Sequence, residues 1–179
     1  GAGGSTRDLT IDLVTRIKRE TGIEAMAHLT CVGHGRDEIR ATLTRLAAGG
    51  IENIMALRGD PPKGTTAFAR HDDGFGYGSE LIAFIKGDPA FDFCVGGGCY
   101  PEIHVECDSA ERDLANLATK VAAGAEFLVT QLFFDNASYF HFVACARSAG
   151  ITVPIIPGIM PVTNNLERLE RFGAQIPPA

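Results

Sequence analysis

Apolar residues recur along the chain at two alternating spacings, one typical of amphipathic helices and the other of buried strands. Helical spacing predicts six helices: from the Ser5 cap to Gly22, through Ile39, Leu43 and Leu46, over Ser79–Lys86, after a cap at Asp108 or Ser109, through Tyr139, Phe142 and Val143, and over Asn164–Phe172. Short apolar runs predict five strands, over Glu24–Cys31, 53–57, Phe91–Gly97, Glu126–Leu132 and Thr152–Ile156. Strands that alternate with helices favour a parallel sheet with right-handed connections.

The turns that lead from a helix into the next strand repeat along the sequence. Ala48-Gly-Gly-Ile51, Ala123-Gly-Ala125 and Ala149-Gly-Ile151 each contain a glycine where a helix is predicted to end. This weak repeat indicates successive βα units. Polar residues gather at the opposite, carboxyl ends of the predicted strands, at His28, Arg58, Asp60, Tyr100, His104 and Gln131. The asymmetry is typical of a (β/α)8 TIM barrel with one active face.

The number of strands limits this interpretation. A closed barrel has eight strands in about 250 residues, whereas the 179 residues of this chain provide five predicted strands. We therefore expect a single partial catalytic barrel domain over residues 1–179, with about five βα units, incomplete at both ends and preceded by at least one strand. A doubly wound α/β sheet is the alternative, but the chain has no Gly-x-Gly-x-x-Gly fingerprint to support it.

Two short segments at predicted strand ends point to ligand binding. The strand at 53–57 is followed by Arg58-Gly-Asp-Pro-Pro62, and the prolines cannot continue a sheet ladder. Arg58 and Asp60 should therefore leave the sheet on a rigid turn, at the edge where parallel α/β folds bind ligands. The glycines Gly96–Gly98, just before Tyr100, favour the close approach of a flat ligand to the backbone, although glycines also end strands.

Composition and charge exclude several classes of partner. The formal net charge of −6 disfavours nucleic acid and anionic membranes. No apolar stretch reaches the roughly 20 residues that span a bilayer, and the first residues lack the charged-then-apolar pattern of a signal peptide, so we expect a cytoplasmic protein. Five cysteines form no Cys-x-x-Cys pair. Cys99, His104 and Cys107 lie close in sequence but lack a fourth ligand at a usual zinc spacing, so we expect no metal site.

Five motifs, read together and in order, resemble the methylenetetrahydrofolate reductase family. They are His28-Leu-Thr-Cys31, Ala56-Leu-Arg-Gly-Asp-Pro-Pro62, Tyr100-Pro-Glu-Ile-His104, Thr130-Gln-Leu-Phe-Phe-Asp135 and Pro157-Gly-Ile-Met-Pro161. The resemblance implies a TIM-barrel flavoenzyme of one-carbon metabolism and methionine supply. Such an enzyme uses FAD to pass a hydride from NAD(P)H to 5,10-methylenetetrahydrofolate, giving 5-methyltetrahydrofolate by ping-pong turnover. We expect a homo-oligomer.

The resemblance also implies roles for individual residues. It assigns FAD contacts to Ala2, His28, Arg58, Gly59, Asp60, Tyr77, Gly78, Tyr100, His104, Asp113, Asn116 and Lys120. The spacing of Asp113, Asn116 and Lys120 agrees, because it places a carboxylate for ribose and a cation for phosphate on one helical face. The bend predicted at Gly96–Gly98 would leave room for the isoalloxazine beside Tyr100.

Residues next to the reacting atoms follow from the same resemblance. Asp60 and Gln131 are the predicted catalytic residues, and both also contact the substrate. An ionised Asp60 beside the flavin would make the reduced ring a better hydride donor. The Gln131 amide offers a donor and an acceptor to a pterin edge or to the nicotinamide. Phe172 is the third predicted substrate contact, stacking on a substrate ring.

Two alternatives remain open at this point. The glutamate that serves as the family's general acid has no counterpart in the chain, so these residues alone are expected to be poor catalysts. A non-catalytic flavin- or folate-binding module is therefore the alternative function. An unrelated phosphate-binding barrel such as an aldolase would need metal ligands or a Schiff-base lysine at a strand end. Lys63, Lys86 and Lys120 are instead predicted in loops or helices.

Overall fold

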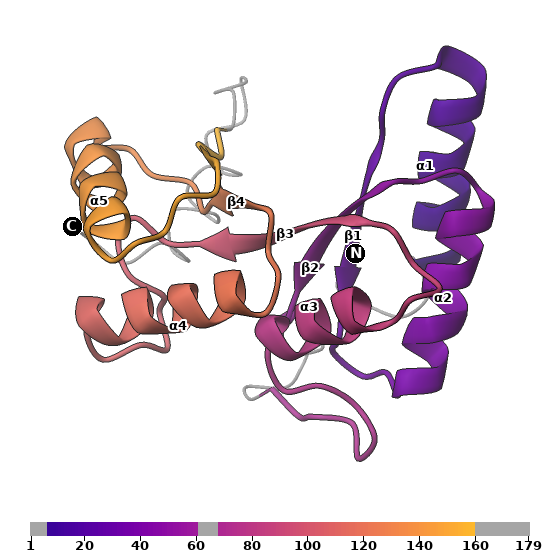
Figure 1. Cartoon of the computed structure of the whole chain (residues 1–179), viewed down its shortest axis with the longest axis horizontal. Helices are drawn as coiled ribbons and strands as arrows, with labels where there is room; N and C mark the ends of the chain where they lie inside the picture. Colours follow the sequence, from indigo (N-terminus) through magenta and orange to yellow (C-terminus); the bar gives the residue numbers. More distant parts are fainter. Residues whose placement is uncertain (1–6, 61–67, 160–179) are drawn as a thin grey trace, which may run out of the picture.

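The computed structural model describes residues 7–60 and 68–159, in which strands and helices alternate (Figure 1). The helices are α1 (Arg7–Thr21), α2 (Arg36–Ala48), α3 (Gly78–Gly87), α4 (Ala110–Ala122) and α5 (Asn136–Ser148). The strands are β1 (Met26–Thr30), β2 (Asn53–Leu57), β3 (Cys94–Cys99), β4 (Phe127–Thr130) and β5 (Ile155–Ile156). The prediction of alternating βα units is confirmed over this part of the chain.

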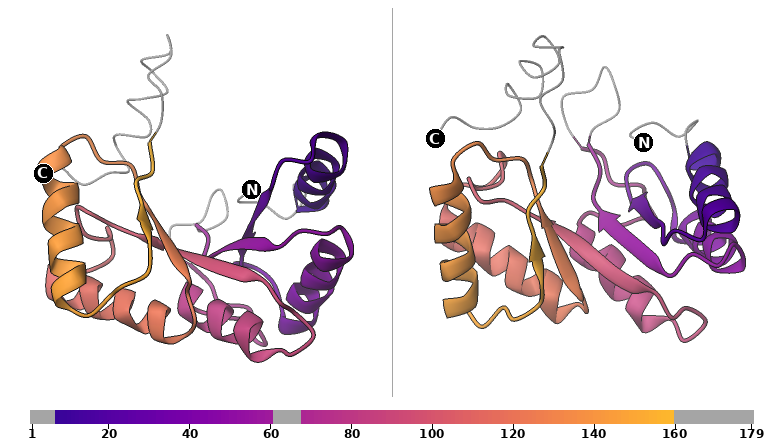
Figure 2. Two further views of the ribbon diagram at one scale, coloured as in Figure 1. Left: turned by 45° about the horizontal axis from the view of Figure 1, so that its top comes forward. Right: turned by 90° about the horizontal axis from the view of Figure 1, so that it is seen from above.

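The five strands form one parallel sheet in the order β1-β2-β3-β4-β5. Each strand therefore pairs with the next one along the chain, which is the arrangement of successive units in a (β/α)8 barrel. The helices of the described residues all cover the same face of the sheet, as Figure 2 shows, and the other face is here called the open face. Burial alternates accordingly, because Ala27 and Leu29 of β1 are buried against the helices whereas Met26 and His28 are exposed on the open face.

The repeated glycine turns share one hydrogen-bonded structure. Gly50, Gly124 and Gly150 all have positive φ angles, at 74°, 109° and 83°. In each turn the next N–H donates to a carbonyl five residues back: Ile51 to Leu46, Ala125 to Lys120 and Ile151 to Ala146, at 3.0–3.1 Å. This is the pattern of a Schellman cap, which requires the left-handed conformation that glycine adopts without strain. The sequence repeat therefore corresponds to a repeated structural unit.

Two groups of buried side chains hold the helices on the sheet. The larger group packs β1, β2 and β3 against α1, α2 and α3, and Ile39, Leu43 and Ile54 are fully buried in it. The smaller group joins β4 to α4 and α5 through Leu117, Leu128, Ala146 and Ile151. Among the helices of the described ranges, none combines the length and apolar composition needed to cross a lipid bilayer.

The predicted boundaries of four strands need correction. Strands expected over Glu24–Cys31, Glu126–Leu132 and Thr152–Ile156 are shorter, because only part of each range pairs with a neighbouring strand. The strand expected over Phe91–Gly97 instead runs from Cys94 to Cys99. Gly96, Gly97 and Gly98 therefore lie within β3 rather than in a bend after it. The predicted Ser5 cap and the helix Asn164–Phe172 lie outside the described residues.

The glycines of β3 have a packing reason that the sequence did not reveal. Gly96 pairs in register with Phe127, and a Cβ atom at position 96 would overlap the ring of that phenylalanine. The room that we expected beside Gly96 for a flat ligand is thus filled by Phe127. Gly98 differs, because a Cβ there would meet its nearest neighbour, Leu57 Cδ2, at an ordinary 3.5 Å.

Candidate active site

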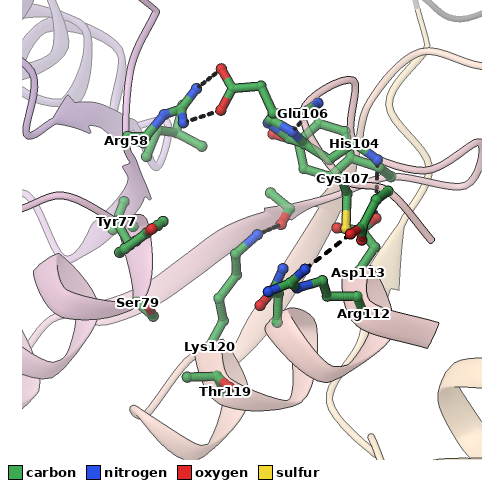
Figure 3. A pocket seen from close by; sticks show the side chains of 17 residues that line it. Arg58, Tyr77, Ser79, His104, Glu106, Cys107, Arg112, Asp113, Thr119 and Lys120 are labelled. Carbon is green, nitrogen blue, oxygen red and sulfur yellow. Dashed lines mark hydrogen bonds and ion pairs between the residues drawn. The ribbon is translucent and has the colours of Figure 1, made fainter. Parts of the chain in front are cut away.

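A cavity of about 560 Å³ opens at the carboxyl ends of β2 and β3, between the amino terminus of α3 and one face of α4 (Figure 3). Its lining includes eight of the residues predicted to contact a cofactor: Arg58, Tyr77, Gly78, Tyr100, His104, Asp113, Asn116 and Lys120. These residues come from four separate segments, and the parallel sheet brings them together because its strands end at a common edge.

The turn after β2 aims Arg58 across the cavity. The Arg58 carbonyl accepts a hydrogen bond from the Val32 N–H at 3.0 Å, which fixes the backbone beside β1. Gly59 then adopts a φ of 89°, and a Cβ there would lie 2.7 Å from Val32 Cγ1. Both the left-handed backbone and the close approach explain why glycine follows Arg58.

The Arg58 guanidinium makes a bidentate ion pair with Glu106 from the loop between β3 and α4. Nη1 donates to Oε2 at 2.5 Å and Nη2 donates to Oε1 at 2.7 Å. These bonds lower the pKa of Glu106 and raise the pKa of Arg58, in each case chiefly through the partner's hydrogen bond. The guanidinium carbon also lies 5.0 Å from the ring centroid of Phe68.

The loop that carries Glu106 is held by hydrogen bonds around His104. Asp113 accepts the His104 backbone N–H at 3.1 Å, and His104 Nδ1 accepts the Glu106 backbone N–H at 3.1 Å. Because Nδ1 is an acceptor, the proton of the neutral ring lies on Nε2. Burial lowers the pKa of His104, which favours that neutral form. Ile103 has a φ of 68°, so the loop turns sharply just before this histidine.

Helix α4 presents one polar face to the cavity. The helix is capped by Ser109, whose side chain accepts the Arg112 N–H at 3.2 Å. Asp113, Asn116 and Lys120 follow at helical spacing, and all three line the cavity as the spacing predicted. Lys120 Nζ donates to the Gly98 carbonyl at 2.7 Å. The helix therefore places a carboxylate, an amide and an ammonium group along one wall.

Burial shifts the pKa values of two lining residues, Lys120 and Tyr100. The pKa of Lys120 is lowered, mainly because burial disfavours the charged ammonium. Its Nζ lies 5.5 Å from the ring centroid of Tyr100. Burial also raises the pKa of Tyr100 to about 12, so this residue is a neutral ring with a hydroxyl donor.

Several lining residues were not anticipated, and only some of them carry a sequence signal. Ser79, Glu106, Cys107, Asp108, Arg112 and Thr119 all border the cavity. Arg112 precedes Asn116 by four residues, so the helical period already indicated that it shares the polar face of α4. Glu106 has no such signal, because its position depends on the conformation of the loop.

Other predicted site residues lie away from the cavity lining. His28, Gly59, Asp60 and Gln131 are at or near the carboxyl edge of β1, β2 and β4 but do not border the cavity. Asp60 is exposed, and Gln131 Oε1 accepts the Leu132 backbone N–H at 2.9 Å. Their chemical roles stay predictions. Ala2 and Phe172 lie outside the described residues.

Within the described residues, no group of three or more histidine, cysteine, aspartate or glutamate side chains is arranged to hold a metal ion. Cys99 is buried, which raises the pKa of its thiol to about 12. All five cysteines are free thiols. Lys86 and Lys120 lie in α3 and α4 rather than at a strand end, as predicted, and Lys63 lies outside the described residues.

Comparisons with known proteins point to one family. The family model described as methylenetetrahydrofolate reductase matches residues 1–179. The chain is 44% identical over 164 residues to 5,10-methylenetetrahydrofolate reductase of Salmonella typhimurium, covering 92% of this chain and 53% of that protein. It is 40% identical over 173 residues to methylenetetrahydrofolate reductase (NADH) 1 of Zea mays, covering 92% of this chain and 29% of that protein. The chain thus spans between 29% and 53% of the length of these relatives.

Solved structures with lower sequence identity share the fold. Phosphonopyruvate hydrolase aligns with a TM-score of 0.65 at 14% identity, covering 95% of this chain and 57% of that chain. An uncharacterized protein from Clostridium thermocellum, which binds two copies of 5-methyl-5,6,7,8-tetrahydrofolic acid, aligns with a TM-score of 0.56 at 16% identity, covering 92% of this chain and 55% of that chain. The neighbours are TIM-barrel-like, so the five strands and five helices are part of that fold, although the sheet of the described residues is not closed.

Proposed function

The chain belongs to the methylenetetrahydrofolate reductase family, and on that premise we propose that its cavity binds FAD and serves the reduction of 5,10-methylenetetrahydrofolate to 5-methyltetrahydrofolate by NAD(P)H. The observation that carries this proposal is the convergence of eight predicted cofactor contacts on one cavity. The chain covers only part of its relatives, so the proposal concerns the gene product that contains these residues.

The residues of the cavity fit the chemical groups of FAD. A volume of about 560 Å³ lies within the range of roughly 300–1,000 Å³ for small-molecule sites. Arg58, Arg112 and Lys120 supply positive charge for a diphosphate, and the amino terminus of α3 begins at Gly78 on the same lining. Asp113 offers a carboxylate to ribose hydroxyls, and the largely buried ring of Tyr100 offers a flat apolar surface.

Bound FAD supplies the capacity to accept and donate a hydride. The chain's own residues bind and orient. Neutral His104 holds a proton on Nε2 and can donate it in a hydrogen bond to an acceptor in the cavity. Asp60 and Gln131 lie at the ends of β2 and β4, on the carboxyl edge of the sheet where substrate would bind. Asp60 would disfavour negative charge on a neighbouring ring.

Gln131 suits recognition of both reactants. Its Oε1 already accepts the Leu132 N–H, which orients the amide and leaves the NH2 group to donate to a substrate. A pterin edge and a nicotinamide carboxamide both carry acceptors for such a donor. A shared position for the two reactants agrees with ping-pong turnover, in which they bind in succession.

The proposal is tested by expressing the full-length gene product and recording its visible spectrum. We expect a yellow protein whose flavin absorbance is bleached by NADH or NADPH and restored by methylenetetrahydrofolate. Because the name of the maize relative specifies NADH, both nucleotides should be compared. A protein that binds FAD without being reoxidised by the folate would support the non-catalytic module instead. A colourless protein that takes up no FAD would overturn the proposal.

A further inference from the structure

Two cations on the cavity wall are bound by carboxylates from a single short segment. Glu106 pairs with Arg58 at the end of β2, and Asp108 accepts a hydrogen bond from Arg112 Nη1 of α4 at 3.0 Å. Both carboxylates belong to residues 106–108, here called the carboxylate segment, and all four residues of the two pairs line the cavity. Figure 3 shows the Arg58–Glu106 pair beside the cavity. The carboxylate segment therefore pairs with two cations of the lining, Arg58 and Arg112.

The remaining charges of the lining are arranged differently. Lys120 donates to a backbone carbonyl, that of Gly98, rather than to a carboxylate. Asp113 accepts the backbone N–H of His104. The described lining thus contains three cations and three carboxylates, and the two arginines are the cations that a carboxylate holds directly.

A guanidinium binds a carboxylate and a phosphate with the same planar, two-pronged geometry. Arg58 binds Glu106 in this geometry. The Glu106 side chain is 51% exposed, so it can turn away from Arg58 into solvent. The Arg112–Asp108 pair is looser, since both side chains are 69% exposed. An entering phosphate can replace either carboxylate without leaving a buried charge unpaired.

We propose that Glu106 and Asp108 occupy the positions that phosphate groups of the ligand take, and that they yield these positions when a diphosphate-bearing ligand binds. The carboxylate segment is then an internal competitor that sets the affinity of the cavity. This inference rests on the proposed function for the identity of the ligand, because FAD carries a diphosphate. Its chemistry applies to any diphosphate that reaches the two arginines.

The competing explanation is that the Arg58–Glu106 pair is a clamp that shapes the loop for binding. The two explanations predict opposite signs. Removing a competitor tightens diphosphate binding, whereas removing a clamp weakens it and lowers the melting temperature of the ligand-free protein. Glu106→Gln keeps the size and one acceptor oxygen of the side chain, so it removes the charge with little change in packing.

The experiment measures dissociation constants of the full-length gene product for FAD, ADP and inorganic pyrophosphate by calorimetry at one fixed salt concentration. Glu106→Gln should tighten all three about fivefold, equivalent to about 1 kcal/mol, and Asp108→Asn about twofold. Glu111→Gln is the matched control, because it removes the same charge from the first turn of α4, and Glu111 does not line the cavity. The control should leave all three constants unchanged.

The three ligands distinguish this inference from the proposed function. If the wild-type protein binds FAD and Glu106→Gln binds the three ligands no more tightly than wild type, the inference is overturned and the proposed function stands. Tighter binding of ADP and pyrophosphate by Glu106→Gln in a protein that does not bind FAD would support the inference and overturn the function. Equal tightening by Glu111→Gln would also overturn the inference, because the effect would then be one of net charge. Absence of binding for all three ligands would overturn both.

Discussion

We expect Lys120→Met to weaken FAD binding about thirtyfold without lowering the free energy of unfolding by more than about 1 kcal/mol. Lys120 lies on the cavity side of α4, with Nζ 2.7 Å from the Gly98 carbonyl. A charge-assisted hydrogen bond to a phosphate is worth about 2 kcal/mol, and this energy corresponds to the thirtyfold change. Methionine keeps an unbranched side chain but removes the charge and the N–H donors of the ammonium.

The expected stability follows from the ionisation of the lysine. Burial lowers the pKa of Lys120, so its charged form is less favourable in the folded protein than in the unfolded chain. Replacing the ammonium by a thioether removes that penalty. The Gly98 carbonyl loses its partner but borders the cavity, where water can replace it. The free energy of unfolding should therefore stay within about 1 kcal/mol of the wild-type value, or rise.

Lys86→Met is the matched control for this experiment. Lys86 also lies on a helix and also donates to a carbonyl, that of Phe93 at 3.1 Å, but it does not line the cavity. Fluorescence titration with FAD and urea unfolding of both variants provide the two readouts. The reasoning is refuted if Lys86→Met weakens FAD as much as Lys120→Met, or if Lys120→Met retains wild-type affinity.

Three further changes test the packing and ionisation that shape the site. Gly96→Ala should lower the free energy of unfolding, measured in urea, by about 1–3 kcal/mol, because the new Cβ overlaps the Phe127 ring. Adding Phe127→Leu to this variant should recover part of the loss. Strictly additive effects of the two substitutions would contradict the contact. Gly59→Ala should lower the free energy of unfolding by at least about 1 kcal/mol more than Gly33→Ala. Both glycines have a positive φ, but of these two positions a Cβ would meet neighbouring atoms at position 59 and none at position 33. Equal losses would show that backbone strain alone matters. Burial lowers the pKa of His104, so on acidification the imidazole is protonated at a higher pH in the unfolded chain than in the folded protein, and stability falls as the pH drops below about 6.5. His104→Asn should therefore lose less stability than wild type between pH 7.5 and 5.0. An equal loss in the two proteins would refute the lowered pKa of His104.

Features set by local periodicity could be predicted from the sequence. The polar face of α4 follows from the spacing of Asp113, Asn116 and Lys120, and all three residues line the cavity. The helix-to-strand turns follow from glycines that must adopt positive φ angles, as Gly50 does. Its position after a predicted strand also indicated that Arg58 lies at the carboxyl edge of the sheet, where it lines the cavity.

Features that depend on register or loop conformation could not be predicted in this way. Gly96 was interpreted as space for a ligand, but the pairing of β3 with β4 places Phe127 over it. The pairing of Glu106 with Arg58 depends on a loop that turns at Ile103 in a left-handed conformation. Isoleucine gives no sequence signal for that conformation, since β-branched residues rarely adopt it.

The central claim is that the cavity between α3 and α4 is the FAD site, and a crystal structure of the full-length gene product with FAD tests it most directly. We predict density for the diphosphate beside Arg58 and Lys120, with Glu106 turned away from the guanidinium. FAD bound elsewhere on the molecule, with the Arg58–Glu106 pair intact beside an empty cavity, would contradict the account.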